Sequence, residues 1–265
     1  MRKGGEFVVR GLYTSASGML AGQVALDATA NNLANVSTVG FKRDRAVYHD
    51  FEDMLLVRLY DSPDGPTPSV PMPVQIVGRL GTGVYAEEVV PDLQAQGPLQ
   101  QTGRPLDIAL QGEGYLVVNT PQGERYTRAG EVQRTADGAL VNLDGHPFQG
   151  ENGDIVIPYG AANADITIAE GGDVAVGESV IDRLRVVTLP PDAQKEGYTL
   201  VSASGGVIEG APGTTVHQGA LEQSTVNGVR EMVELIQIQR AYEAGQKMIE
   251  ASDDSLARLF ELVAG

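Results

Sequence analysis

The chain has 265 residues, more than the ~100 to 150 of a typical single domain, which predicts one large or two modest domains. Its 35 acidic and 19 basic side chains give a formal net charge of -16, which argues against nucleic acid as a partner. Cysteine is absent, so disulfides, thiolate metal sites and cysteine nucleophiles are excluded.

The amino-terminal segment reads MRKGGEFVVRGLY and holds one short apolar run, Phe7, Val8 and Val9. A signal-peptide core needs ~7 to 15 apolar residues, so we expect no cleaved secretion signal. No stretch approaches the ~18 apolar residues of a membrane span either. We therefore expect a chain that is soluble or leaves the cytoplasm by a signal-independent route, without direct membrane insertion.

A heptad repeat follows this segment. Large apolar residues recur every seven positions at Leu12, Met19, Leu26 and Leu33. Ala16 and Ala30 fill the complementary positions, and Gln23 interrupts them. The spacing predicts an amphipathic helix with a coiled-coil seam. Because small and polar residues separate the apolar ones, an isolated helix would be marginal, and its apolar stripe needs a partner.

The helical pattern ends in the stretch NNLANVSTVGFKRDR, residues 31 to 45. Its asparagines, hydroxyl residues and glycine tolerate left-handed backbone and cap helix ends; they are Asn31, Asn32, Asn35, Ser37, Thr38 and Gly40. The stretch therefore predicts that the helix stops and the chain changes direction. Ordinary capping accounts for these residue types as well as a role in assembly does.

The residue composition changes after this turn. The piece DSPDGPTPSVPMPV, residues 61 to 74, holds five prolines and predicts an extended linker or surface loop. From about residue 75 to 218, short runs of Val, Ile, Leu and Tyr alternate with turn clusters such as ADGAL, NLDGH and ENGD. This alternation predicts many short strands joined by tight turns.

A second heptad seam occupies the carboxy-terminal end. Its positions alternate in steps of three and four at Leu235, Ile238, Tyr242, Gly245, Ile249, Ser252, Leu256, Leu259 and Val263. Gly245 and Ser252 are small, and small residues at a seam permit close backbone approach. A helix from about Val226 to Val263 would be roughly 55 Å long, longer than a small β domain requires, so its far turns need other chains to cover them.

The predicted fold class is therefore α+β, with paired amino- and carboxy-terminal heptad helices (coiled coil) around a central all-β domain. We expect four parts: an amino-terminal helix and turn (1–45), an extended proline-rich linker (46–80), an all-β outer domain (81–218) and a carboxy-terminal helix (219–265). The two helical parts together would form one inner coiled-coil domain.

Signals for enzyme chemistry are weak. The three histidines, His49, His146 and His217, are widely spaced and form no metal or triad motif. GTGVYA (81–86) and GEGYLV (112–117) imitate part of a dinucleotide-binding turn, but neither is followed by a helix pattern, so both predict turn or bulge glycines. Tryptophan is absent, which leaves few platforms for sugar stacking. We predict no enzyme activity, no cofactor and no metal site.

Two long terminal motifs resemble a known family. SGMLAGQVALDATANNLANVSTVGFKR (17–43) resembles the amino-terminal signature of bacterial flagellar rod and hook proteins, and GALEQSTVNGVREMVELIQIQRAYEAGQKMI (219–249) resembles their carboxy-terminal signature. GPLQQTGRPLDIALQGEGYLVV and GERYTRAGEVQRTADGALVNLDGHPFQG are similar to their β domain. Such proteins usually begin close to a segment like RGLYTSASGM, so we expect the natural start near Val8 or Val9, which mass spectrometry of the native protein would test.

The resemblance implies a structural rod subunit of the basal body, outside the cytoplasmic membrane. Its partners would be copies of itself, other rod and hook subunits and the flagellar export apparatus. The assembly interface would consist of both seams and the turn: Leu12, Met19, Leu26, Leu33, Asn31, Asn32, Asn35, Gly40, Phe41, Leu235, Ile238, Tyr242, Ile249, Leu256 and Leu259. Phe41 would anchor the turn by burial, Lys42, Arg43 and Arg45 would face acidic neighbours, and Thr225 would cap the second helix.

Several alternatives stay open at this point. The middle, residues 81 to 218, suits a rod subunit better than the larger middle of hook proteins. GRLGTGVYAEEV resembles the segment after the distal-rod insertion, whereas GERYTRAGEVQRTADGALV is at least as similar to proximal-rod relatives, so both rod positions remain. Outside the family, the alternatives are an exported β-rich binding or adhesin module oligomerised by its terminal helices, and a secreted hydrolase.

Overall fold

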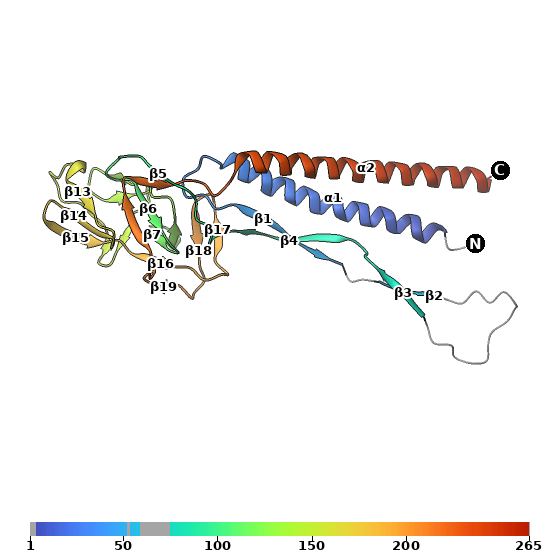
Figure 1. Cartoon of the computed structure of the whole chain (residues 1–265), viewed down its shortest axis with the longest axis horizontal. Coiled ribbons are helices and arrows are strands. Elements are labelled where there is room, and N and C mark those ends of the chain that lie inside the picture. The colour runs from blue at the N-terminus through green and yellow to red at the C-terminus, as the bar shows by residue number, and fades with distance from the viewer. Residues whose placement is uncertain (1–3, 52–53, 59–74, 265) are drawn as a thin grey trace. The chain divides into compact units, whose positions relative to one another are not determined.

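The structure is a computed structural model that describes residues 4–51, 54–58 and 75–264. One long helix lies at each end of the chain, α1 (Gly4–Ala34) and α2 (Gly228–Ala264), and the segment between them is rich in strands (Figure 1). The predicted α+β class, with helical ends and a β-rich centre, is therefore confirmed. Of the expected linker (46–80), the proline-rich stretch 61–74 lies outside the described residues, whereas residues 46–50, 54–58 and 75–80 are in strands.

The chain divides into two compact units that draw on different parts of the sequence. Unit 1 comprises residues 1–29, 45–90 and 233–265. Unit 2 comprises residues 30–44 and 91–232. Each helix thus contributes most of its length to unit 1 and one end to unit 2.

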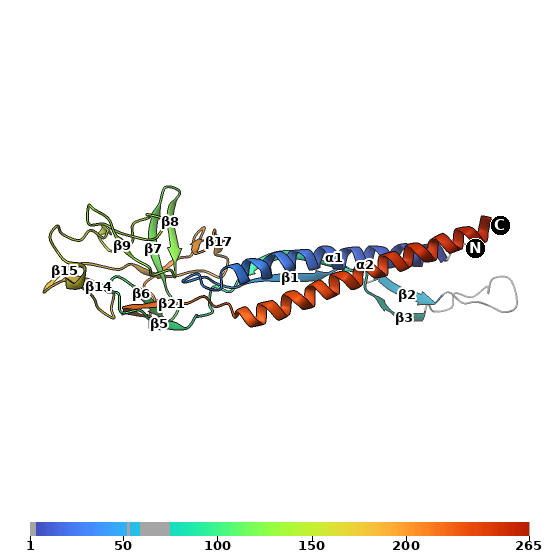
Figure 2. The ribbon, with the colours of Figure 1, turned by 90° about the horizontal axis from the view of Figure 1, so that it is seen from above.

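Unit 1 contains helix and strand pairs. Its strands are β1 (Asp44–Asp50) paired with β4 (Val84–Pro91) and β2 (Met54–Arg58) paired antiparallel with β3 (Gln75–Leu80). The stretch before β4 contacts α1, since the Thr14 hydroxyl donates to the Thr82 carbonyl at 3.3 Å and the Val84 N–H donates to the Ser17 hydroxyl at 3.3 Å. Figures 1 and 2 show α1 and α2 running side by side along this unit.

The largest sheet of unit 2 has six strands. In spatial order they are β17 (Gln194–Glu196), β18 (Leu200–Ser202), β8 (Gly123–Thr127), β7 (Tyr115–Thr120), β16 (Val186–Thr188) and β19 (Ile208–Glu209). All neighbours are antiparallel, with Val117 opposite Tyr126 between β7 and β8. Short strands and close antiparallel pairing are what the alternation of apolar runs and turn residues predicts.

Smaller sheets complete unit 2. A three-stranded sheet follows the 3-10 turn η1 (Asn163–Asp165) and contains β13 (Ile166–Ile168), β14 (Asp173–Val176) and β15 (Ser179–Arg183). The two-stranded pairs are β9 (Gln133–Arg134) with β10 (Leu140–Val141), β11 (Gln149–Gly150) with β12 (Gly153–Asp154), β20 (Thr215–Gln218) with β6 (Ile108–Gln111), and β21 (Ala220–Glu222) with β5 (Leu99–Gln101).

Strand β7 is buried on both faces, which explains its continuous apolar sequence. Leu116 and Val118 point into one core cluster, together with Phe148, whereas Tyr115 and Val117 point into another. Successive side chains of a strand alternate between faces, so one strand can supply both clusters. The six-stranded sheet is therefore the central layer of unit 2.

The glycine turns lie where the sequence predicts them. Gly138 of ADGAL and Gly145 of NLDGH have φ angles of 89° and 85°, a region that favours glycine. The two stretches that imitate a dinucleotide-binding turn lead into β4 and β7. Since a strand and not a helix follows each, their assignment as turn or bulge glycines is confirmed.

Candidate assembly site at the helix junction

The end of α1 is held by its asparagines. The Asn31 side-chain amide donates to the Asp44 carboxylate at 2.9 Å. Asn32 pairs with the Asp44 backbone in both directions, donating to its carbonyl and accepting from its N–H, each at 2.8 Å. Asn35 donates to the Asn31 carbonyl at 2.8 Å, which caps the last turn. The asparagines therefore end the helix and also attach it to the start of β1.

The turn after α1 is tightly packed at Gly40 and Phe41. Gly40 has a φ of 69°, and a Cβ built on it would lie 2.4 Å from the backbone nitrogen of Ala129. Its N–H donates to the Glu222 carbonyl at 2.8 Å. The predicted burial of Phe41 is confirmed, because its side chain is fully buried, with the Lys195 ammonium 3.5 Å from its ring centre.

We call the contact between residues 31–44 and residues 222–231, with the charged side chains around it, the junction. Glu222 is its central buried carboxylate. Its side chain has no exposed surface and accepts from Lys42 Nζ at 2.7 Å and from Arg128 Nη1 at 3.0 Å. The Gly97 N–H donates to it at 2.9 Å. Two cations and a backbone donor thus compensate for removing one carboxylate from water.

Two further carboxylates surround the turn. Glu231, fully buried in the first turn of α2, accepts from Arg43 Nε at 2.6 Å and from the Asn32 amide at 3.2 Å. Asp44 accepts from Lys195 Nζ at 3.0 Å. Helix amino termini favour negative charge, so an acidic residue suits the position of Glu231 in the first turn of α2. The prediction that Lys42 and Arg43 face acidic neighbours is confirmed, while that for Arg45, which is exposed, stays a prediction.

Burial changes the proton affinity of the junction lysines. It lowers the pKa of the Lys42 ammonium, and the neighbouring Glu222 carboxylate opposes this shift. It also lowers the pKa of Lys195, with the hydrogen bond to Asp44 acting in the opposite direction. In each case the paired carboxylate favours the charged form of the lysine against the effect of burial.

The start of α2 is capped by Asn227, and the expectation that Thr225 caps it is wrong. The Asn227 side-chain oxygen accepts from the Arg230 N–H at 3.1 Å. The Thr225 hydroxyl instead accepts from the Arg43 N–H at 2.9 Å, and the Thr225 N–H donates to the Phe41 carbonyl at 3.1 Å. Thr225 lies before the capping position, which Asn227 occupies. Its backbone and hydroxyl pair instead with Phe41 and Arg43, in the segment that follows Gly40.

We expect Asn227→Ala to lower the free energy of unfolding by about 1 kcal/mol, because α2 loses its side-chain cap. Chemical denaturation of the purified chain would measure the loss. Asn119→Ala, at an exposed position of β7, is the matched control and should change stability by less than about 0.5 kcal/mol. Equal effects in the two variants would contradict the capping role.

The predicted seam of α1 is only partly buried. Leu12, Met19 and Leu26 are half-buried, and so is Leu33 near the end of the helix. The deepest positions of α1 within unit 1 are small instead; they are Ala21, Ala25, Ala28 and Thr29. Small side chains allow neighbouring elements to approach the helix backbone closely, so the most enclosed face of α1 is not the face of its largest residues.

The predicted seam of α2 is its less exposed face. Leu235, Ile238, Tyr242, Gly245, Ile249, Ser252 and Leu256 are all half-buried. Leu259 lies in α2, and its side chain is outside the described set. A Cβ on Gly245 would lie 2.8 Å from Met19 Cγ, and one on Gly22 would lie 4.0 Å from Ile238 Cγ2. Gly245 thus leaves room for the Met19 side chain, while the close backbone approach expected there stays a prediction.

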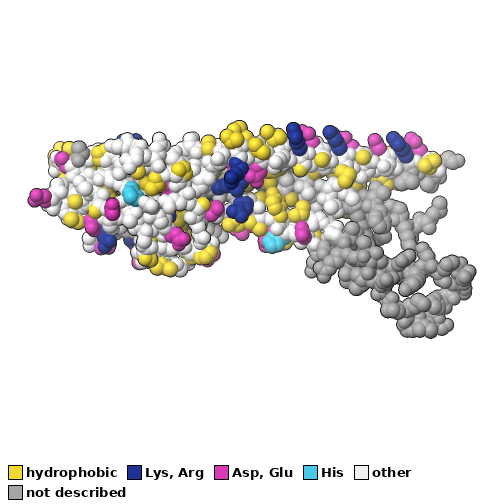
Figure 3. Space-filling model, viewed as in Figure 1, with side chains coloured by type: hydrophobic (Ala, Val, Ile, Leu, Met, Phe, Trp, Pro, Cys, Tyr) yellow, Lys and Arg dark blue, Asp and Glu magenta, His cyan; other side chains and the backbone are white. Residues whose placement is uncertain are grey.

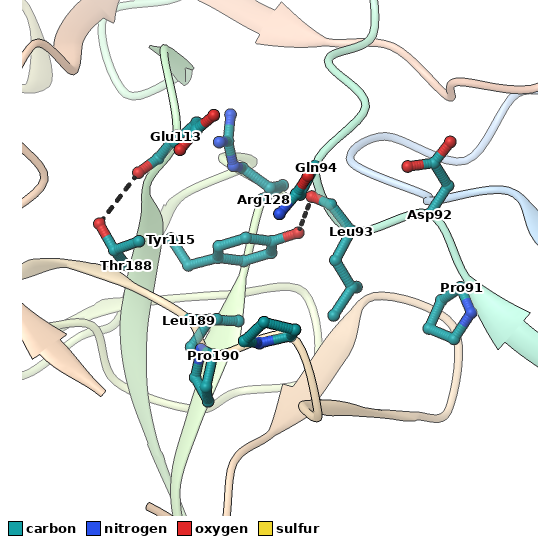
Figure 4. Close-up of a pocket in the computed structure, with 11 residues that line it drawn as sticks. Pro91, Asp92, Leu93, Gln94, Glu113, Tyr115, Arg128, Thr188, Leu189 and Pro190 are labelled. Atoms are coloured by element: carbon teal, nitrogen blue, oxygen red, sulfur yellow. Dashed lines mark hydrogen bonds between the residues drawn. The ribbon is translucent and has the colours of Figure 1, made fainter. Parts of the chain in front are cut away.

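A cavity of about 270 Å³ lies in unit 2 around Tyr115 (Figure 4). The Tyr115 hydroxyl donates to the Leu93 carbonyl at 2.6 Å, and burial raises its pKa. Arg128 lies 5.0 Å from the ring centre, and its Nε has no hydrogen-bond partner in the part of the chain that the structure describes. The guanidinium of Arg128 thus interacts with the face of the Tyr115 ring in addition to its hydrogen bonds.

The sequence did not identify Glu222, Arg128 or Lys195 as functional candidates, since each meets its partner only through folding. Among the described residues, no group of three or more histidine, cysteine or acidic side chains is arranged to hold a metal ion. Within the same residues, no helix is long and apolar enough to cross a membrane. Buried charge pairs connect the turn after α1 with β21 and the first turn of α2.

Three family models match successive parts of the chain. They are the models described as flagella basal body rod protein (residues 12–42), flagellar hook protein FlgE/F/G D1 domain (109–176) and flagellar basal body rod FlgEFG protein C-terminal (217–262). The first and last include the asparagine turn and the start of α2.

Curated relatives match over nearly the whole chain. The flagellar basal-body rod protein FlgG of Buchnera aphidicola subsp. Acyrthosiphon pisum is 34% identical over 271 residues, which cover 96% of this chain and 100% of the relative. FlgG of Caulobacter vibrioides is also 34% identical, covering 96% of this chain and 99% of the relative. The flagellar basal-body rod protein FlgF of Escherichia coli is 32% identical, covering 89% and 91%. The chain therefore belongs to the flagellar basal-body rod protein family.

Proposed function

We propose that this chain is a structural rod subunit that polymerises helically through α1 and α2 and transmits torque from the motor to the hook. One observation carries the proposal: the rod family models match the two terminal helices themselves, at residues 12–42 and 217–262. In a structural subunit, the residues that the family shares are expected in the elements that contact neighbouring subunits.

The half-buried seams are the proposed assembly surfaces. The 37 residues of α2 extend about 55 Å at ~1.5 Å per residue. Its seam side chains retain exposed surface in the isolated chain, and copies packed as coiled coils would cover it. In this proposal residues 1–45 and 219–265 form the inner domain, and residues 81–218 form the outer β domain.

The junction of buried charges would set the angle at which each chain leaves the inner domain. Partners would be further copies of the chain and other rod and hook subunits, placed in the periplasmic rod. Delivery through the flagellar export apparatus is part of the same proposal. Because the contacts join different surfaces of successive copies, they need not close into a ring.

We expect Leu26→Asp or Ile249→Asp to abolish rod assembly and motility, because a charge enters a seam that becomes buried between copies. The measurement is motility, together with detection of the variant in isolated basal bodies. Leu20→Asp and Gln239→Asp, at exposed positions outside the seams of the same helices, are matched controls and should assemble. Circular dichroism should show the β-rich signal unchanged in all four variants.

Normal motility in both seam variants would contradict polymerisation through the helices. Absence of the wild-type chain from complete basal bodies would overturn the whole proposal.

A further inference from the structure

Unit 2 contains another hollow, beside the turn that follows α1. It has a volume of about 340 Å³. Its lining comes from the turn after α1, the loop after β8, the β10–β11 connection and the β17–β18 turn, and includes Val39, Leu143, Tyr198 and Leu200. Leu143 and Tyr198 are 60% and 65% exposed. Large exposed apolar side chains gathered at a hollow are typical of an interaction surface.

The charged residues that line this hollow are acidic. They are Glu131, Asp144 and Glu196, and no lysine or arginine is among the lining residues that the structure describes. Glu131 lies 3.7 Å from Arg104, and Glu196 lies 2.5 Å from Arg125, so two of the three carboxylates have a basic neighbour. Asp144 is exposed at the rim. We name this surface the acidic hollow; its chemistry favours an apolar side chain accompanied by a cation.

The first turns of α2 present that chemistry. Val229 is 70% exposed, Met232 48% and Val233 50%, and Arg230 is exposed between them. Positions three and four apart share one side of a helix, so the three apolar residues form one patch beside the arginine. Figure 3 shows hydrophobic side chains along this part of the surface, followed by Lys and Arg side chains farther along α2. We name these four residues the entry face.

We propose that the entry face of one copy docks into the acidic hollow of a second copy. The inference rests on the proposed polymerisation and adds which surfaces meet. Apolar side chains of the entry face would cover Leu143 and Tyr198, and Arg230 would lie against Asp144. Because hollow and face are different surfaces, a docked pair of copies leaves one hollow and one face free, which allows an open-ended polymer.

Disulfide cross-linking tests the contact directly, since the chain has no cysteine of its own. The double variant Leu143→Cys with Val229→Cys would be expressed in place of the wild-type chain, and basal bodies would be oxidised. On a non-reducing gel we expect a series of covalent dimers, trimers and longer oligomers that disappears when a reducing agent is added. Tyr159→Cys with Val229→Cys is the matched control, because Tyr159 is fully exposed outside the hollow and should give no such series.

A variant that enters basal bodies without forming covalent oligomers above the level of the control overturns the docking inference and leaves the proposed function intact. A disulfide formed within one chain would change only the mobility of the monomer, and it would also overturn the docking inference. If the wild-type chain is missing from basal bodies, the proposed function itself fails.

Charge reversal provides a second, independent test. Asp144→Lys and Arg230→Glu should each reduce incorporation into basal bodies about tenfold, because attraction at the contact becomes repulsion. The double variant should recover most of the loss. Asp137→Lys, an exposed acid outside the hollow, carries the same charge change and should assemble normally. Unimpaired single variants, or a double variant as impaired as the singles, would overturn the inference even if the cysteine pair fails to assemble.

Discussion

Replacement of Glu222 by alanine is expected to lower the free energy of unfolding of unit 2 by about 3 to 5 kcal/mol. The substitution leaves Lys42 and Arg128, both almost fully buried, without the carboxylate that they share. An uncompensated buried charge costs far more than the loss of one surface ion pair. Urea denaturation, followed by a signal of the β-rich unit, would measure the change.

The matched control is Glu209→Ala. Glu209 also pairs with an arginine, Arg185, but it is 61% exposed, so its loss should cost less than about 1 kcal/mol. Similar losses in the two variants would show that burial of Glu222 does not govern its contribution.

Glu222→Gln adds a dependence on pH. Burial already lowers the pKa of Lys42, and removing the negative charge of Glu222 lowers it further. Because this folded-state pKa lies below the unfolded value, the unfolded chain binds more protons between the two, and stability rises with pH there. The deficit of Glu222→Gln relative to wild type should therefore narrow as the pH rises toward about 10, the ordinary lysine value. A deficit that stays constant would contradict the role of Lys42.

Gly40→Ala is expected to lower the free energy of unfolding by about 2 to 5 kcal/mol. A φ of 69° costs an L-residue about 1 to 2 kcal/mol. The new Cβ would also lie 2.4 Å from the Ala129 nitrogen, so two backbone segments must move apart, at about 1 to 3 kcal/mol.

Gly103→Ala separates these two contributions. Gly103 has a φ of 72°, yet no heavy atom lies within 4 Å of the position that a Cβ would take there, so only the conformational cost applies. The difference between the two variants in thermal or urea unfolding measures the packing at Gly40. Equal losses would mean that the turn after α1 has room to adjust.

The local pattern of the sequence predicts the helices and the turn well. Heptad spacing marks both α1 and α2, because a helix repeats its faces within a few residues. The asparagines and Gly40 mark where α1 stops, since their conformational preferences are also local. The tight turns around Gly138 and Gly145 follow from the same kind of short-range signal.

The partners of the buried charges depend on long-range contacts. Lys42 and Glu222 are 180 residues apart, and Asn32 and Glu231 are 199 apart. Neither periodicity nor composition indicates which acid meets which base over such separations. For the same reason the sequence suggests Thr225 as a cap, although folding places its hydroxyl beside Arg43.

The sequence predicts correctly that both seams lie on helices. That they form contacts between copies stays a prediction. The structure brings Met19 to Gly245 and Gly22 to Ile238. It also places Ala21, Ala25 and Ala28 deeper than the leucines of α1. Periodicity ranks residues by hydrophobicity, whereas burial also depends on how closely a neighbouring element can approach.

The junction has a consequence for the order of folding. Residues 31–44 find their hydrogen-bond and charge partners mainly in residues 222–231, near the far end of the chain. Contacts between such distant segments carry a high loop-closure entropy and form slowly. During synthesis from the amino terminus, this turn cannot be completed until residue 231 has been added. The junction therefore forms only when residues 222–231 meet residues 31–44, so a chain that lacks either segment cannot complete it.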